Sequence, residues 1–115
     1  MILPKLLSLS STDLDAGALP RDPDHCLVSI VATIGPSSGI AGDNFSFLVA
    51  TPSALAEAGT YGWGRGILIV ESFSWAVVER SINRLITHAA RDTWQEVAQA
   101  LNKELLWESD SYQPG

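Results

Sequence analysis

Residues 26–34 read CLVSIVATI, and this stretch decides the fold class. One set of alternate residues is apolar throughout: Cys26, Val28, Ile30, Ala32 and Ile34. Successive side chains of a β-strand point to opposite faces, so this period of two predicts a strand with one buried face. The other set mixes apolar and hydroxyl residues: Leu27, Ser29, Val31 and Thr33. This mixture predicts partial cover on the second face as well.

Further strands are expected on both sides of this stretch. Residues 5–9 predict a short first strand, and residues 10–25 form a loop because their glycine, prolines and four aspartates give turn chemistry without an apolar period. Downstream, a strand that runs to about Ala50 presents one apolar face, formed by Phe45, Phe47 and Val49. The run ILIV at residues 67–70 is apolar throughout, which predicts a short strand more deeply buried than the others.

Helical periods dominate the rest of the chain. Pro52 is suited to the first turn of a short helix that Gly59 ends. After Ser74, a capping residue, apolar side chains recur at helical spacing: Val78, Ile82, Leu85, Ile86 and Ala89. A second helix opens with the capping-box pair Thr93 and Glu96. Its apolar stripe comprises Trp94, Val97, Ala98, Leu101 and Leu105.

Strands followed by two helices predict an α+β fold, an antiparallel sheet of about four strands packed on one face by two C-terminal helices. The length of 115 residues fits one domain, residues 1–115. The longest mostly apolar run has nine residues, and a membrane helix needs about twenty. Pro4 and Lys5 interrupt any signal core, and Cys26 has no partner for an intramolecular disulfide, so we expect a cytoplasmic protein.

The chain is acidic, with a net charge of −6 and a pI near 4.6. A negative surface repels phosphate backbones, so we expect no nucleic-acid partner, and no segment predicts membrane association. The charge would suit a basic protein partner, and it would also serve solubility alone. The aspartates of the first loop, Asp13, Asp15, Asp22 and Asp24, are the candidates for steering such a partner.

Catalytic and metal-binding patterns are weak. His25 adjoins Cys26, but neighbours on a strand point to opposite faces and do not form a dyad. The strings DLD and DPD in the first loop lack the glycine and terminal glutamate of a calcium loop. GWGRG at residues 62–66 precedes a strand, unlike a phosphate-binding loop, so we expect no cofactor and no metal. A small ligand-binding or catalytic site in the His25/Cys26 region is the alternative.

Two other segments carry side chains typical of interfaces. In residues 59–66, Tyr61, Trp63 and Arg65 alternate with glycines, and these residue types are enriched at interface hot spots. Trp63 would otherwise fold back onto the domain. The row Arg80, Arg84, His88 and Arg91 is predicted to lie along the outer side of the first long helix, as a solvated face or a second interface.

The C-terminal residues combine a core residue with exposed ones. Trp107 is two residues past Leu105 and off the helical stripe, which predicts that its ring closes the end of the core. Glu108, Asp110 and Tyr112 then emerge beyond it as candidate partner contacts.

Several strings also follow one another in a recognisable order: IG at 34–35, GDNFSFLVATPSAL at 42–55, GILIVESFSW at 66–75 and WQEVAQALNKELLWESDSY at 94–112. The matching positions are Ile34, Gly35, Asp43, Phe45, Thr51, Pro52, Leu55, Ile69, Val70, Glu71, Trp94, Val97, Leu101, Trp107, Glu108, Asp110 and Tyr112. On these residues the sequence resembles the immunity protein 8 family of bacterial polymorphic-toxin systems, over about residues 25–112. Ser109 and Ser111 alter the spacing of the last motif.

The resemblance implies a cytoplasmic immunity protein that binds and neutralises a cognate toxin domain, in systems of secreted or contact-dependent toxins. Such proteins are inhibitors without cofactors, not enzymes. If the toxin is a nuclease with a basic groove, the acidic loop would occupy or shield that groove. The family supplies no toxin-contact residues, so the partner-binding candidates above come from the residues themselves, with Trp63 and Tyr112 as expected anchors.

Overall fold

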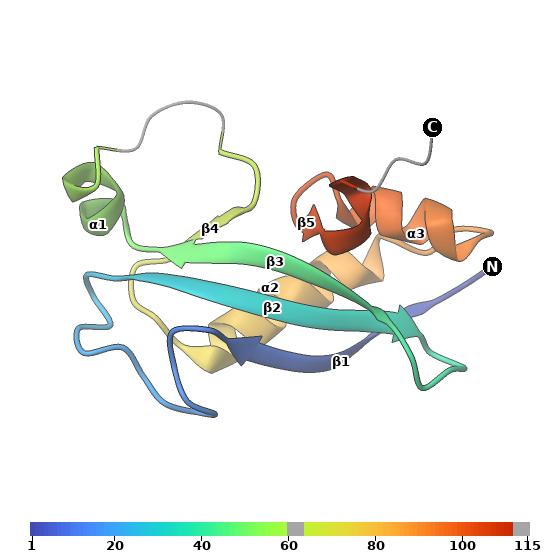
Figure 1. The fold of residues 1–115 in the computed structure, drawn as a ribbon, viewed down its shortest axis with the longest axis horizontal. Coiled ribbons are helices and arrows are strands. Elements are labelled where there is room, and N and C mark those ends of the chain that lie inside the picture. The colour runs from blue at the N-terminus through green and yellow to red at the C-terminus, as the bar shows by residue number, and fades with distance from the viewer. Residues whose placement is uncertain (60–63, 112–115) are drawn as a thin grey trace.

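The sheet begins as an antiparallel meander of three strands (Figure 1): β1 (Pro4–Ser11), β2 (Leu27–Pro36) and β3 (Asp43–Ala50). The computed structural model describes residues 1–59 and 64–111. β2 pairs with β3 along its length, from Leu27 opposite Ala50 to Ile34 opposite Asp43. The predicted inner face of β2 is buried, as is that of β3, so the alternation that predicted these strands is confirmed.

Two short strands extend the sheet beyond β3. β4 (Ile67–Ile69) pairs with one half of β3, and β5 (Leu106–Trp107) pairs with the other. The predicted α+β class is confirmed, with five strands in the sheet. The antiparallel prediction holds for β1, β2, β3 and β5 but is wrong for β4, which runs parallel to β3. A crossover connection that includes α1 (Pro52–Glu57) brings the chain back beside Leu48, so that β4 runs in the same direction as the last three residues of β3.

β4 also corrects the prediction that ILIV is the most deeply buried strand. Ile69 is 61% exposed, whereas several core residues of β2 and β3 are completely buried. β4 is the outermost strand of its half of the sheet, so only one of its faces packs on the core. A continuous apolar run therefore marked a strand with one exposed face, not a central strand.

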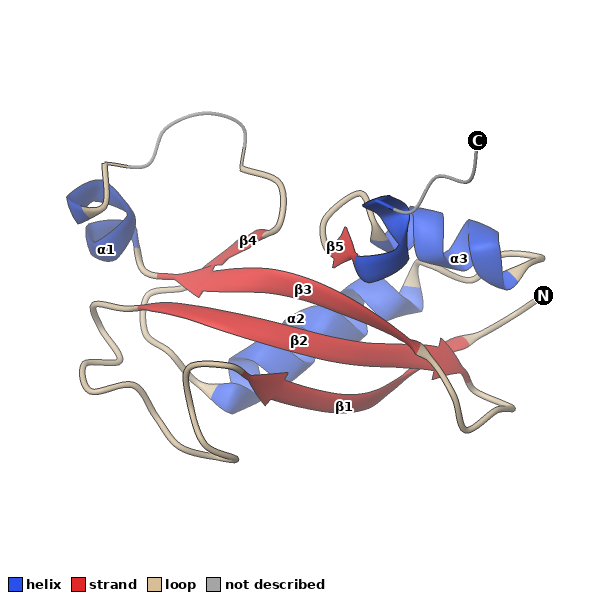
Figure 2. Ribbon diagram, in the orientation of Figure 1, coloured by secondary structure: helices blue, strands red, loops and turns tan. Residues whose placement is uncertain are grey.

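The two C-terminal helices are α2 (Trp75–Thr87) and α3 (Trp94–Leu101). Ser74 accepts a hydrogen bond from the Val77 amide, and Thr93 accepts one from the Glu96 amide, so both predicted caps are confirmed. α2 crosses behind the strands in Figure 2. The buried residues of both helices form one hydrophobic cluster with the inner face of the sheet: Val78, Ile82, Ile86, Val97, Ala98 and Leu101.

The arginine row does not continue along α2 as predicted. The helix ends at Thr87, and His88 is its C-cap. Arg91 lies beyond the helix, where it pairs with Ile2 and its guanidinium donates to the carbonyls of His88 and Ala90. The local spacing was helical, but these carbonyl contacts take Arg91 off the helix surface.

No helix among the described residues has the length and apolar character to cross a membrane.

Candidate functional site

The acidic loop consists of residues 12–26, between β1 and β2. It is exposed, but two hydrogen bonds anchor it. The Trp75 indole donates to the Ala18 carbonyl at 2.8 Å, and the Phe73 amide donates to the Pro23 carbonyl at 2.8 Å. These bonds hold the loop against the start of α2. The loop therefore presents its four exposed aspartates, Asp13, Asp15, Asp22 and Asp24, from a defined backbone.

The four aspartates differ in their local roles. Asp13 accepts a hydrogen bond from the Ser29 amide of β2 at 2.7 Å. Asp22 accepts one from the Asp24 amide at 3.1 Å. The carboxylates of Asp15 and Asp24 make no hydrogen bond within the described part of the chain. Asp15 and Asp24 are thus the carboxylates whose charge can be removed with least effect on the fold.

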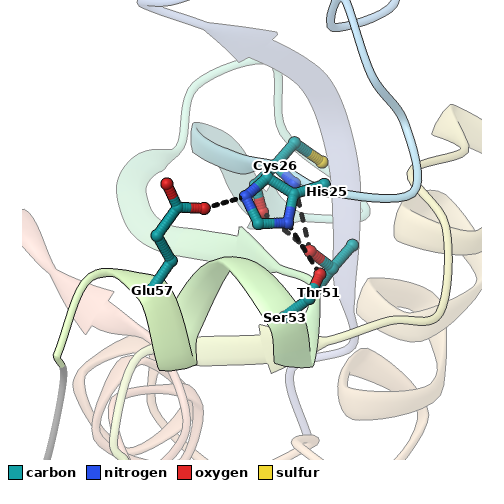
Figure 3. A network of polar contacts seen from close by, with 5 residues as sticks. All are labelled: His25, Cys26, Thr51, Ser53 and Glu57. Atoms are coloured by element: carbon teal, nitrogen blue, oxygen red, sulfur yellow. Dashed lines mark hydrogen bonds and ion pairs between the residues drawn. The ribbon is translucent and has the colours of Figure 1, made fainter.

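His25 joins this loop to α1 (Figure 3). Its Nδ1 lies 2.8 Å from the Ser53 hydroxyl, and its Nε2 contacts the Glu57 carboxylate. Ser53 and Glu57 are four residues apart, so both project from the same side of α1. Sequence reasoning missed both partners, because only the pairing of β2 with β3 brings residue 25 to the helix after residue 51.

This cluster contains the residue types of a serine–histidine–carboxylate triad, but its setting differs from one. The carboxylate of a triad is buried and holds the imidazole in place. Here the side chains of His25 and Glu57 are 41% and 73% exposed, so water screens their interaction. Ser53 belongs to the first turn of a regular helix, with no strained elbow to project its hydroxyl. The contacts serve to tie the start of β2 to α1.

Cys26 belongs to the core and not to the His25 cluster. Its side chain is 9% exposed, and its thiol lies 3.5 Å from the Pro23 carbonyl. Burial raises the pKa of the thiol, and the nearby carboxylates of Asp22 and Asp24 raise it further. The thiol therefore stays protonated at neutral pH, which makes it a poor nucleophile.

Arg65 is engaged by the segment that follows α3. Its guanidinium donates to the backbone carbonyl of Asn102 at 2.9 Å, to the Asn102 side-chain oxygen at 2.6 Å, and to the Leu105 carbonyl at 3.4 Å. These bonds satisfy carbonyls near the end of α3. Arg65 thus has a structural role whether or not it also contacts a partner.

The remaining predicted partner residues lie near the chain's end or outside the described residues. Glu108 is exposed in the short helix η1 (Glu108–Ser111), which contacts β3. The backbone of Asp110 belongs to the same helix. Tyr61, Trp63 and Tyr112, and the side chain of Asp110, lie outside the described residues.

Asp43 organises a cluster that the sequence did not reveal. One of its carboxylate oxygens accepts hydrogen bonds from the indoles of Trp94 at 2.8 Å and Trp107 at 3.3 Å. Trp107 also stacks on Phe45, with 6.5 Å between ring centroids. The predicted closing of the core by Trp107 is confirmed, and the cluster joins β3, α3 and β5. Four motif residues thus meet in one structural contact.

No three side chains of histidine, cysteine, aspartate or glutamate lie together as a metal site within residues 1–59 and 64–111. A family model described as immunity protein 8 matches residues 5–112, which confirms the resemblance and extends it to β1. No curated protein and no solved structure matches the chain.

Proposed function

The chain belongs to the immunity protein 8 family, and from this premise we propose that it binds and neutralises one cognate bacterial toxin domain. The family match over residues 5–112 is the observation that carries the proposal. The role is inhibition by binding, in the cytoplasm of the cell that produces the toxin. That cell and its kin are thereby protected in a polymorphic-toxin or contact-dependent inhibition system.

The distribution of charge supports a basic partner. Residues 74–105, which include α2 and α3, hold four acidic and four basic residues. Residues 1–73 hold seven acidic and three basic residues, and residues 106–115 hold two acidic and none basic. The whole net charge of −6 therefore comes from outside the helical segment, as −4 and −2. Complementary charge speeds the association of such a surface with a basic groove, and for this reason we propose a nuclease as the toxin.

The proposal is tested by growth. The toxin domain encoded immediately upstream is expressed from an inducible promoter in a sensitive bacterial host, with or without this chain. We expect the colony count after induction to fall by several orders of magnitude without the chain and to stay unchanged with it. The purified pair should also co-elute in size-exclusion chromatography. Equal killing with and without the chain would rule out the proposed function.

The cluster of His25, Ser53 and Glu57 favours one second candidate, a small catalytic or ligand-binding site near residues 25–26. A His25→Ala variant separates the two. It removes the imidazole from an exposed position and should keep full protection if the chain inhibits by binding. Hydrolysis of an activated ester by the purified chain, abolished in His25→Ala, would support the catalytic candidate instead.

Electrostatic steering predicts an effect on the association rate. Changing Asp15 and Asp24 to asparagine removes two charges from the acidic loop. The hydrogen bonds that the carboxylates of Asp13 and Asp22 accept from backbone amides are kept. We expect association with the toxin to slow on the order of twofold to tenfold at low ionic strength, and the difference to shrink as salt is added. Stopped-flow fluorescence measures the rate.

The matched control for steering is Glu79→Gln with Glu104→Gln, which removes two charges from exposed residues 79 and 104 on the helical side. This control should change the rate by less than about twofold. Equal slowing by both pairs would mean that net charge alone matters and that the loop has no special place.

A further inference from the structure

The sheet has a second face that α2 and α3 leave open, except at the end next to α1, where Ala50 is completely buried. α2 lies behind the strands in Figure 1, so the viewer looks onto this open face. The pairing register places its side chains in rows across the strands. The rows are Leu27, Ala50 and Ile69, then Ser29, Leu48 and Ile67, then Val31, Ser46 and Leu106, with Thr33 and Asn44 beyond.

Exposed apolar side chains gather on the open face. Leu27 is 40% exposed, Ile69 61% and Leu106 41%, and they come from β2, β4 and β5. Val31 and Leu48 lie between them and are half-buried. Segments far apart in the sequence thus contribute to one apolar surface. Large apolar residues that cluster at the surface in this way mark a binding site more often than isolated ones do.

The polar residues that β2 and β3 place in these rows are small and uncharged. Ser29 and Ser46 carry small hydroxyl groups. The Thr33 hydroxyl donates a hydrogen bond to the Asn44 side-chain oxygen at 2.7 Å, so these two polar side chains are partners of each other. None of the eleven residues in the rows is charged. Depletion of charge at the centre is the composition that distinguishes an interface from the rest of a surface.

Three acidic residues lie next to the ends of the strands that form the open face. Asp13 bonds the Ser29 amide at its β1 side, Glu71 follows β4, and Glu108 follows β5. Arg65, at the β4 side, has its guanidinium bonded to Asn102 and Leu105, and the exposed Lys5 of β1 lies opposite Gly35 at the far end of the face. An apolar centre with an acidic rim is complementary to a partner whose apolar patch is bordered by lysine or arginine.

We propose that the open face of the sheet is the surface on which the toxin domain docks, with Leu27, Ile69 and Leu106 as apolar anchors and the acidic loop at its margin. This inference rests on the proposed function and adds the place of contact. Asp13 of the acidic loop and Glu108 of η1, both predicted from the sequence as partner-binding residues, lie next to this face. The arginines Arg80 and Arg84 lie on α2, behind the sheet.

Two variants each introduce one arginine side chain, on opposite sides of the molecule. Ser46→Arg inserts it between Val31 and Leu106 on the open face, and Ala76→Arg places it at an exposed position of α2 as the matched control. Isothermal titration calorimetry with the upstream toxin domain gives the affinity of each variant. We expect Ser46→Arg to weaken binding on the order of a hundredfold and Ala76→Arg by less than about threefold.

Thermal melting checks that both variants fold, and Ile69→Arg at the exposed edge repeats the test should Ser46→Arg be unfolded. Binding of Ser46→Arg or Ile69→Arg within about threefold of wild type overturns the docking surface, as does equal weakening by Ala76→Arg. If wild type binds and protects in either case, the proposed function stands and only the surface is wrong. If wild type fails to bind, both fall together.

Discussion

An alanine at Gly35 is expected to lower the free energy of unfolding by about 3 kcal/mol, the upper end of the usual cost of overpacking, because the contact is with backbone. Gly35 is buried near the end of β2, where the chain turns toward β3. A Cβ atom there would lie 2.2 Å from the carbonyl oxygen of Ala41 and 3.0 Å from the Cα of Gly42. Both are backbone atoms, so the turn itself must shift to admit the methyl group.

The same turn offers the control. At Gly39 an added Cβ would meet nothing closer than the Pro36 carbonyl oxygen at 3.8 Å. Gly39→Ala should therefore change stability by less than about 1 kcal/mol, and reduced entropy of the unfolded chain would make the change favourable. Urea denaturation followed by circular dichroism measures both variants. A Gly35→Ala protein as stable as Gly39→Ala would show that the turn is soft and that the motif glycine has another purpose.

Residues whose partners are local were predicted well from the sequence. The alternation of Cys26–Ile34 identified the buried face of β2, and Ser74 and Thr93 were placed correctly as helix caps. In each case the deciding interaction lies within a few residues, so the spacing itself contains the information.

Features that depend on distant partners were not predicted. β4 was predicted to be the most deeply buried strand because its apolar run does not specify which neighbour it pairs with or in which direction. β5 has two residues, too few to give any period. The same limit applied to the sites: His25 meets Ser53 and Glu57 only after β2 and β3 have paired, and the open face combines residues 27, 69 and 106. The acidic loop could be proposed from the sequence because its four aspartates are close together along the chain.

Loss of the Asp43 carboxylate is expected to lower the stability of the protein without changing its affinity for the toxin domain. Replacing Asp43 with alanine leaves the indole N–H groups of Trp94 and Trp107 without their shared acceptor. Hydrogen bonds to a charged acceptor contribute about 1.5–3 kcal/mol each, so we expect the free energy of unfolding to fall by about 3 kcal/mol. Asp43→Asn keeps an oxygen that can accept both bonds but loses the charge, and should cost about 1 kcal/mol. Urea denaturation measures both variants.

The motif residues Asp43, Trp94 and Trp107 bind one another, which gives them a role in folding, and we expect other residues to contact the toxin. Asp43→Ala should therefore bind the toxin domain within about twofold of wild type at a temperature where both proteins are folded. Protection in cells at higher temperature should fall, since a smaller fraction of the variant is native. A folded Asp43→Ala protein that lost affinity on the order of a hundredfold would move the interface to the Asp43 end of β3. In that outcome the tryptophans, and not the apolar rows of the open sheet, would be the toxin's anchors.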